Sequence, residues 1–284
     1  MAGLRETRDL IGRHGVRPTK SLGQNFLVDE NVLAKIASTG GLDRNDLVIE
    51  VGPGLGALTR HLAAQAGRVV AVEIDRHLLE ALNEALSGLD NVEVVHADIL
   101  DCDLPALLRG WEGPVKVVAN LPYYITTPVV MKFLEELPAC SRMVFLVQRE
   151  VADRMAAGPG TKDYGSLSVA VRYFADPKRV FTVPPSCFLP PPEVESAVVR
   201  LDVRPTPPVA LTDRRLFSAV VRAAFGQRRK TLHNALGSSG LVPGGRDALA
   251  AVLAEQGLPP QIRGEALTME QFAQLANHIA SMKS

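Results

Sequence analysis

Residues 47–73 read LVIEVGPGLGALTRHLAAQAGRVVAVE, an alternation of apolar runs and glycines from which the fold class follows. Leu47–Val51 and Arg68–Glu73 are short β-branched runs typical of buried strands, and residues 56–65 between them have helical spacing. The glycines that follow the first run permit a tight turn into the helix. A strand, a helix and a strand in succession predict two parallel strands joined by a crossover helix.

The same alternation continues on both sides of this stretch. Asp29 is the expected N-cap of a first helix. Apolar periodicity predicts helices at 30–38, 76–86, 128–137, 149–156 and 167–174, and strands at 92–96, 115–119 and 142–148. Strand-like runs at 179–183 and 196–203 have no helix between them, so we expect them to pair antiparallel at one edge. The pattern predicts an α/β domain with helices on both faces of a mostly parallel sheet.

The proline-rich segment 204–208 is typical of a linker, because proline extends neither a helix interior nor a central strand. Beyond it the periodicity is helical throughout. Helices are expected near 213–225, 228–236 and 248–253, and a capping box beginning at Thr268 opens a last one. We therefore expect a basic N-terminal extension at 1–22, either a binding arm or a disordered tail, an α/β domain at 23–204 and a helical domain at 209–284.

Composition limits the classes of protein to which the chain can belong. Its 284 residues, 46% of them hydrophobic, are enough for a large domain and a smaller one. No apolar stretch is long enough to span a membrane, and residues 1–20 are too polar for a signal peptide. Cys102, Cys140 and Cys187 are too dispersed for a disulfide framework or a zinc cluster, and the histidines show no metal spacing. We expect a cytoplasmic protein without a metal.

Charge is balanced overall, with 31 basic and 31 acidic residues, but it is segregated along the chain. Acidic residues predominate between Glu73 and Glu112, whereas residues 200–233 are mainly basic. The basic stretch includes Arg222, Arg228, Arg229 and Lys230. Such a cluster can bind phosphate groups, which makes these four residues candidates for contact with a nucleic acid. A solvated helix face would have the same composition.

Polar and glycine residues follow the predicted strands where each one ends. Gly52 and Gly54 lie in the loop between the first strand and its helix, where a backbone can approach a ligand. Glu73 ends the second strand, where a carboxylate can accept ribose hydroxyl groups, and Asp98 follows the third. Because ligands bind at the carboxyl ends of parallel strands, we expect these residues in one crevice. The glycine spacing alone also fits a dinucleotide-binding loop or an ordinary turn.

The run Asn120-Leu121-Pro122-Tyr123-Tyr124 ends another predicted strand. The Asn120 amide offers an acceptor oxygen, and Pro122 holds the chain extended so that the Leu121 carbonyl can also accept. Tyr123 supplies a flat aromatic face. Acceptors beside an aromatic ring suit the exocyclic amine of a base held out of its stack, although an ordinary turn with half-buried tyrosines fits the same residues. We expect a structural role for Tyr124.

Taken together, these motifs resemble the S-adenosylmethionine-dependent adenine-N6 dimethyltransferases of ribosomal RNA over nearly the whole chain. Within that family the similarity is greatest to bacterial enzymes that dimethylate two adjacent adenosines near the 3′ end of small-subunit rRNA. The residues that carry the resemblance are Gly23–Leu27, Glu50–Gly56, Val72–Asp75, Asp98, Asn120–Tyr123, Phe188 in its proline-rich loop, and Phe225–Leu232. The segment before Gly23 matches none of the family's motifs.

The resemblance implies a Rossmann-like class I methyltransferase at 23–204, with a mostly parallel seven-stranded sheet and an antiparallel edge strand, and an all-helical RNA-binding domain at 209–284. It implies that Asn25, Leu27, Gly52, Gly54, Glu73, Asp98 and Asn120 hold S-adenosylmethionine. Asn120, Leu121, Tyr123 and Phe188 would hold and orient the target adenine. The expected partner of this monomer is the small ribosomal subunit with its rRNA, and no membrane is involved.

Three other functions remain open. A ribosome-assembly factor that acts mainly by binding would share the basic helices, but would not need all of Glu73, Asp98, Asn120 and Tyr123. A large-subunit rRNA adenine methyltransferase would share most of the motifs. A nicotinamide-dependent dehydrogenase would share the glycine loop and Glu73 but leaves the Asn120–Tyr123 turn unexplained.

Overall fold

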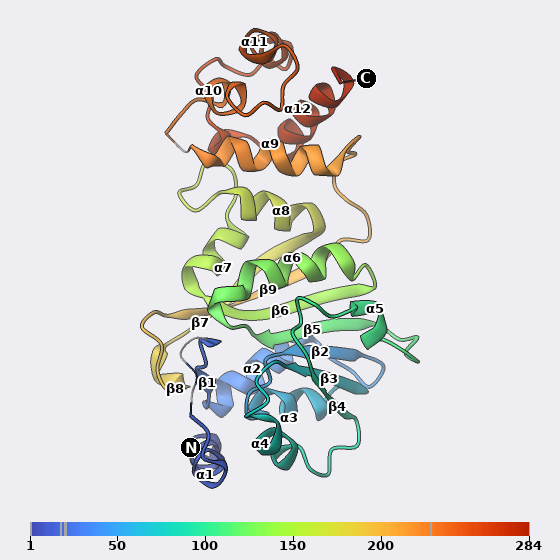
Figure 1. Ribbon diagram of the computed structural model, residues 1–284, viewed down its shortest axis with the longest axis vertical. Coiled ribbons are helices and arrows are strands. Elements are labelled where there is room, and N and C mark those ends of the chain that lie inside the picture. The colour runs from blue at the N-terminus through green and yellow to red at the C-terminus, as the bar shows by residue number, and fades with distance from the viewer. Residues whose placement is uncertain (1, 18, 20–21, 228, 284) are drawn as a thin grey trace. The chain divides into compact units, whose positions relative to one another are not determined.

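The computed structural model describes residues 2–17, 19, 22–227 and 229–283 (Figure 1). The chain forms two compact units. Unit 1 comprises the chain up to Ala152 together with Ala175–Pro205, and unit 2 comprises Asp153–Phe174 and the chain from Thr206 onward.

Unit 1 is built on a seven-stranded sheet in the order β4-β3-β2-β5-β6-β9-β7. Its strands are β2 (Leu47–Val51), β3 (Arg68–Glu73), β4 (Val92–His96), β5 (Val115–Asn120), β6 (Cys140–Gln148), β7 (Ala175–Val183) and β9 (Ser196–Val203). The first five of these pair in parallel, whereas β9 runs antiparallel to both β6 and β7. The predicted α/β class and the antiparallel pair at one edge are confirmed. The strand that opposes the others is β9, one position in from the edge.

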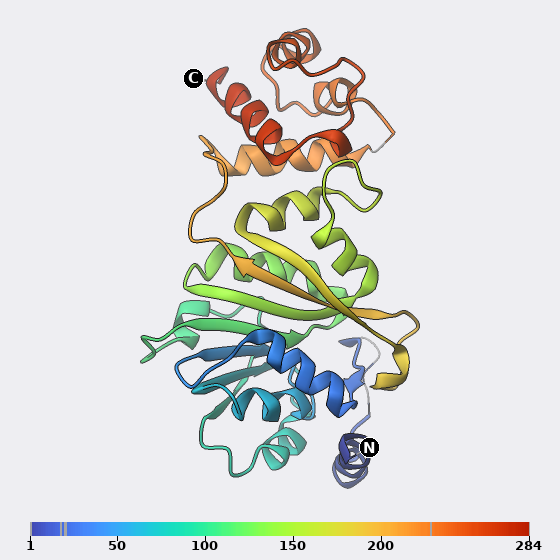
Figure 2. The same cartoon turned by 180° about the vertical axis from the view of Figure 1, so that it is seen from behind.

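Helices cover both faces of this sheet. They are α2 (Glu30–Gly40), α3 (Ala57–Ala63), α4 (Leu79–Ala85), α5 (Leu104–Leu107) and α6 (Thr126–Glu136), and α7 (Arg149–Ala156) follows β6 and crosses from unit 1 into unit 2 after Ala152. Ile36 of α2 and Leu62 of α3 pack against Val48, Val118 and Val144 of the sheet. Figure 2 shows α2 and α3 in front of the sheet, whereas Figure 1 shows α6 in front of its other face. The central strand β2 is therefore buried on both faces, which explains its uninterrupted apolar run.

The polar residues at helix starts act as the sequence predicts. The Asp29 carboxylate caps α2 by accepting hydrogen bonds from the backbone amides of Asn31 at 3.0 Å and Val32 at 3.1 Å. These amides have no partner inside the helix, so the cap fixes the residue at which α2 begins. This start matters because the segment just before it, residues 23–28, reaches the candidate site described below.

Two features of unit 1 were not predicted. Helix α1 (Ala2–His14) occupies most of the N-terminal extension, and its Leu10 is only 3% exposed. The expectation of a disordered tail is therefore wrong for this segment. In addition, β1 (Phe26–Leu27) pairs antiparallel with β8 (Phe188–Leu189), which follows the short turn η3 (Pro185–Cys187). Both features depend on contacts between residues far apart in the chain, which local periodicity does not reveal.

Unit 2 is entirely helical. It contains α8 (Ser166–Phe174), α9 (Arg214–Gly226), α10 (Leu232–Gly237), α11 (Gly245–Glu255), the short turn η4 (Gly264–Ala266) and α12 (Met269–Ser281). The capping box predicted at Thr268 is present, with reciprocal bonds between Thr268 and Gln271. The helix predicted at 228–236 instead begins at Leu232, because the Thr231 hydroxyl caps it by accepting from the amide of Asn234.

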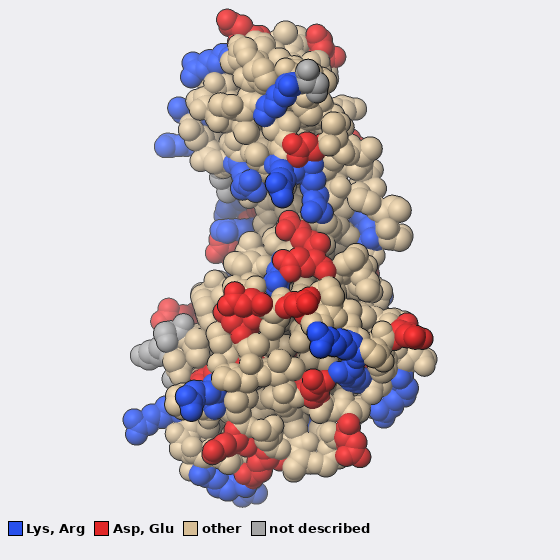
Figure 3. All heavy atoms as spheres, turned by 45° about the vertical axis from the view of Figure 1, so that its right-hand side comes forward, with Lys and Arg blue, Asp and Glu red and all other residues tan. Residues whose placement is uncertain are grey.

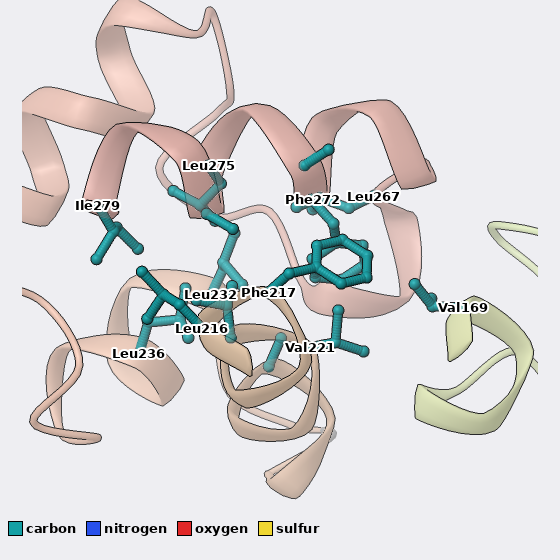
Figure 4. Close-up of a cluster of buried hydrophobic side chains, with 14 of the residues drawn as sticks. Val169, Leu216, Phe217, Val221, Leu232, Leu236, Leu267, Phe272, Leu275 and Ile279 are labelled. Atoms are coloured by element: carbon teal, nitrogen blue, oxygen red, sulfur yellow. The ribbon is translucent and has the colours of Figure 1, made fainter. Parts of the chain in front are cut away.

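The core of unit 2 also takes in a segment that the sequence assigned to the α/β domain. Figure 4 shows Phe217 of α9 and Phe272 of α12 packed together, with Val169 of α8 facing them. The Tyr164 hydroxyl donates a hydrogen bond to the backbone carbonyl of Leu267 at 3.0 Å. Residues 153–174 therefore belong to this unit, although we expected them within 23–204. Their apolar spacing predicted burial but not the partner against which they are buried.

Candidate active site

The four strands β4, β3, β2 and β5 are parallel neighbours, so their carboxyl ends meet at one edge of the sheet. A cavity with about 1140 Å³ of atom-free space, including its open mouth, lies at this edge within unit 1. Among the residues that line it are Asn25, Leu27, Gly52, Gly54, Glu73, Asp98, Asn120, Leu121 and Tyr123. Of the residues predicted to hold a cofactor or a base, the cavity brings together all except Phe188.

The glycine loop after β2 lets the backbone pass close to other chain segments. Gly52, Gly54 and Gly56 all have φ between 59° and 77°, a region that residues with a side chain rarely adopt. A Cβ atom at Gly54 would lie 3.1 Å from the ring of Phe26 on β1. The loop and the Gly23–Leu27 motif therefore pack directly against each other where they border the cavity.

Glu73, at the end of β3, is held in place by the backbone. Its carboxylate accepts hydrogen bonds from the amide of Gly54 at 3.1 Å and the amide of Asp75 at 2.9 Å. The side chain is 3% exposed, and this burial raises its pKa despite the two hydrogen bonds. Gln24 donates to Asp75 at 2.7 Å, which ties the N-terminal motif to the same turn.

Glu50 opens the Glu50–Gly56 motif, but no role was predicted for it in the cavity that it lines. It sits near the end of β2, is 1% exposed, and its Oε2 atom has no hydrogen-bond partner among the described residues. Burial, together with the nearby Glu73 carboxylate, raises the pKa of Glu50 to about 8. The signal was available, because Glu50 is the only charged residue in the run Leu47–Val51. A buried carboxyl group in a cavity wall, with one oxygen that has no partner among the described residues, is suited to a cationic ligand.

The turn after β5 presents the amide of Asn120 to the cavity. Asn120 Nδ2 lies 3.4 Å from the backbone carbonyl oxygen of Asn25, to which it donates. With its nitrogen directed at that carbonyl, the amide oxygen is left to accept a hydrogen bond from a ligand. Leu121 is 1% exposed, and its amide donates to the carbonyl of Leu146 at 3.1 Å. The turn is therefore anchored to β6 on one side and to the N-terminal motif on the other.

The two tyrosines of this turn differ in their surroundings. They belong to the 3₁₀ turn η2 (Tyr123–Ile125). Tyr123 is half-buried, and its hydroxyl is 2.6 Å from the Ser196 hydroxyl, which fixes the ring. Tyr124 also lines the cavity but is 53% exposed. The expectation that Tyr124 is structural is therefore not supported, because its ring is largely open to solvent and carries little of the packing.

Phe188 lies apart from the predicted constellation. It pairs with Leu27 across the small β1–β8 sheet, is 4% exposed, and packs in the hydrophobic core with Val183 and Cys187. It is not among the residues that line the cavity. In this structure Phe188 is a core aromatic residue.

The basic residues predicted to contact nucleic acid lie in unit 2. Arg222 is exposed on α9, and Arg229 and Lys230 are exposed just after it, whereas Arg228 lies outside the described residues. Neither Arg222, Arg229 nor Lys230 forms an ion pair with any described residue, so their charges are available to a ligand. In the space-filling view of Figure 3, Lys and Arg side chains (blue) are exposed on the visible face, and Asp and Glu side chains (red) lie between them.

Two structural features are absent from the described residues. No described helix is both long and apolar enough to cross a membrane. No cluster of three or more His, Cys, Asp or Glu side chains suited to a metal ion occurs in the part of the chain that the structure describes.

Comparison with known proteins identifies similar chains. The family model for ribosomal RNA adenine dimethylase matches residues 16–281. A ribosomal RNA small subunit methyltransferase A from Pelotomaculum thermopropionicum is 52% identical, over 95% of this chain and 94% of its own length. The protein with the same name from Clostridioides difficile is 48% identical, over 96% of this chain and 94% of its own.

Two solved structures are also similar. A dimethyladenosine transferase from Plasmodium falciparum has a TM-score of 0.75 at 26% identity and covers 87% of this chain and 94% of its own. The 23S rRNA methyltransferase ErmE has a TM-score of 0.69 at 30% identity and covers 90% of this chain and all of its own. The first acts on adenosine by its name, and the second on 23S rRNA.

Proposed function

The chain belongs to the ribosomal RNA adenine dimethylase family, and we propose that it transfers methyl groups from S-adenosylmethionine to the N6 amino groups of two adjacent adenosines near the 3′ end of small-subunit rRNA. The product is N6,N6-dimethyladenosine. The observation that carries this proposal is one cavity that joins the Asn120–Tyr123 turn to Glu73 and Asp98. Relatives named for the small subunit, such as those at 52% and 48% identity over nearly the full length, support the choice of substrate and partner.

The residues of the cavity fit S-adenosylmethionine. Glu73 would accept the ribose hydroxyl groups and Asp98 the adenine amino group, while Asn25, Leu27, Gly52, Gly54 and Asn120 would border the methionine part. The buried carboxyl of Glu50, whose Oε2 atom has no partner among the described residues, gives independent support, because this cofactor carries positive charge. When bound, it supplies an electrophilic methyl group on its sulfonium.

The chain contributes position rather than acid or base chemistry. An adenine amino nitrogen is a poor nucleophile because its lone pair is delocalised into the ring. If Asn120 Oδ1 and the Leu121 carbonyl accept its two N–H groups, the nitrogen becomes pyramidal and its lone pair is localised. The Tyr123 ring, whose hydroxyl is fixed by Ser196, would stack on the base and hold its amino nitrogen oriented toward the methyl group. Such orientation can supply roughly 7–11 kcal/mol.

We propose that Arg222, Arg228, Arg229 and Lys230 bind RNA phosphates. Changing Arg222, Arg229 and Lys230 together to glutamine is expected to weaken RNA binding and to reduce the slope of log affinity against log salt by about 0.7–0.9 for each phosphate that the variant no longer neutralises. Filter binding between low and high salt measures this slope. Lys178→Gln is the control, because Lys178 pairs with Asp176 in unit 1. An unchanged slope in the triple variant would remove these residues from the RNA interface.

The role of Phe188 can be separated from its packing. Phe188→Ala is expected to cost about 3–5 kcal/mol of unfolding free energy, because it empties a buried site. Phe188→Leu should keep most of that stability. If Phe188 acts only in the core, the leucine variant retains methyl transfer; if Phe188 moves to stack on the target base, that variant loses methyl transfer while its thermal midpoint is preserved.

The function itself is tested by supplying labelled S-adenosylmethionine to small ribosomal subunits that lack the adenosine methylations, with free large-subunit RNA alongside. Label on two adjacent adenosines, up to two methyl groups each, supports the proposal. Label only on large-subunit RNA would favour a large-subunit rRNA adenine methyltransferase. The similarity to ErmE is the specific observation for that second candidate function. Subunit binding without label would indicate an assembly factor. We further propose that the protein is a monomer and acts in the cytoplasm; the free cysteines Cys102, Cys140 and Cys187 support the cytoplasmic location, because thiols stay reduced there.

A further inference from the structure

Helix α1 lies outside the family model, which begins at residue 16, yet it reaches the cofactor cavity. Thr7, at the middle of α1, is 5% exposed and is one of the residues that line the cavity. The helix is therefore part of the wall of the candidate site, and no motif of the sequence accounts for it.

The apolar contacts of α1 are made with residues that themselves line the cavity. Leu10 packs in a cluster with Phe26, Leu55 and Leu78, and all three of these residues also line the cavity. One side of each residue thus supports the helix while another side borders the space for the ligand. A ligand that orders these side chains would strengthen the surface on which α1 docks, and loss of α1 would loosen them.

The polar contacts of α1 orient it but hold it weakly. Arg60 pairs with Glu6 at 3.0 Å, and both Arg13 and His14 contact the Glu84 carboxylate on α4. Glu6, Arg13 and Glu84 are exposed to solvent, whereas Arg60 and His14 are partly shielded. Ion pairs with an exposed partner contribute little to stability.

Among the described side chains of α1, those of Leu10 and Thr7 are buried, and Leu4 and Ile11 pack only partly buried against the same cluster as Leu10. Because its apolar contacts are confined to this one small cluster, α1 is expected to detach more readily than the helices that cover the sheet.

Close packing of the backbone makes the docking of α1 sensitive to a single methyl group. A Cβ atom at Gly3 would lie 2.9 Å from the backbone oxygen of Val28 and 2.4 Å from the Glu30 carboxylate. Gly12, in the same helix, has no atom within 4 Å of such a Cβ. The two glycines therefore separate docking of the helix from its formation, since alanine favours a helix over glycine at either position.

We propose that α1 is a detachable wall of the cofactor cavity, and that its docking and the binding of S-adenosylmethionine stabilise each other. The proposal rests on the proposed function for the identity of the ligand. Because coupling between two equilibria is reciprocal, the factor by which the ligand favours the docked helix is the factor by which the docked helix favours the ligand.

The first test is limited trypsin digestion of the full-length protein with and without S-adenosylhomocysteine, the demethylated form of the cofactor. Arg5, Arg8 and Arg13 in α1 are cleavable only when the helix detaches, and the exposed Arg263 in unit 2 is the internal reference. The ligand is expected to slow cleavage in α1 by about tenfold, within the usual range of coupling, and to leave cleavage at Arg263 unchanged.

The second test is calorimetric binding of S-adenosylhomocysteine to variants. Gly3→Ala and Leu10→Ala are each expected to weaken binding by about fivefold or more, whereas Gly12→Ala binds at least as tightly as the wild type. Leu253→Ala, which truncates an equally buried leucine in unit 2, controls for general destabilisation. Wild-type affinity in Gly3→Ala and Leu10→Ala, or ligand-independent cleavage of α1, would overturn the proposal. If the wild type itself binds no S-adenosylhomocysteine, the proposed function falls together with it.

Discussion

Asn120→Ala is expected to lower the rate of methyl transfer by about 10²–10³-fold, the loss seen when one oriented hydrogen-bonding group is removed from a transition state. The physical reason is the position of the amide, which Asn25 orients so that its oxygen can accept an N–H of the target adenine. Alanine removes this acceptor and leaves the Leu121 carbonyl alone. The nitrogen lone pair then stays delocalised in the ring, and the base is free to rotate.

The measurement is single-turnover transfer of labelled methyl groups to small subunits, with RNA affinity determined in parallel. RNA affinity is expected to stay within about twofold of the wild type, because the proposed phosphate contacts Arg222, Arg229 and Lys230 lie in unit 2 and do not line the cavity. Asn31→Ala is the control, since Asn31 is an exposed residue of unit 1 that does not line the cavity. Unchanged turnover in Asn120→Ala would remove Asn120 from the mechanism.

The sheet could be predicted because burial on both faces leaves a clear mark in the sequence. The bounds of β2, β3, β4 and β9 are those expected from the apolar runs. Helix α1 could not be predicted in this way, because its sequence is rich in arginine and its short apolar stripe of Leu4, Leu10 and Ile11 packs against a cluster that only the fold assembles. Whether such a segment is ordered depends on the surface formed by Phe26, Leu55 and Leu78, which are brought together only by the fold.

In the candidate site, too, some residues could be placed from the sequence and others only from the fold. Gly52, Glu73, Asp98 and Asn120 could be placed in one crevice from the rule that ligands bind at the carboxyl ends of parallel strands. Phe188 could not be placed, because its role was implied by the resemblance and its position depends on the pairing of β8 with β1. Glu50 could not be assigned a role, because the apolar run Leu47–Val51 indicates that the strand is buried but not that the Oε2 atom of its carboxyl lacks a partner among the described residues. The cost of burying that charge leads to the second prediction.

Glu50→Gln is expected to stabilise the ligand-free protein at alkaline pH. The pKa of Glu50 rises from the ordinary glutamate value of 4.5 to about 8 in the folded protein. Between these values the unfolded chain has lost the proton and the folded protein retains it, so the folded state is penalised increasingly as pH rises from 4.5 to about 8. Each pKa unit corresponds to about 1.4 kcal/mol, so the free energy of unfolding is lowered by on the order of 4–5 kcal/mol once the pH exceeds the folded-state pKa. Glutamine has no charge to bury.

The measurement is urea unfolding of the wild type and Glu50→Gln at about pH 5 and about pH 8.5. The two proteins should differ little at the acidic pH, and the variant should be the more stable by a few kcal/mol at the alkaline pH. Asp46→Asn is the matched control, because Asp46 is also 1% exposed but accepts hydrogen bonds from Lys116 and from the amide of Asp43, each at 2.7 Å. Breaking that buried pair should destabilise the protein at both pH values. A Glu50→Gln variant less stable than the wild type at the alkaline pH would contradict the prediction.

The same substitution is expected to weaken cofactor binding by about tenfold or more, as the loss of one charge-assisted contact of roughly 1.5–3 kcal/mol implies. In the wild type a cationic ligand favours the ionised carboxylate, so binding near neutral pH should expel the proton of Glu50. Calorimetry in two buffers with different ionisation enthalpies measures this release, which should be absent in Glu50→Gln.

Affinity for S-adenosylmethionine should also rise from about pH 6 toward about pH 8 in the wild type only. A stability gain without any loss of affinity would show that Glu50 does not face the ligand, whereas opposite changes in stability and affinity would identify it as a residue whose burial is tolerated because the cofactor supplies its missing partner.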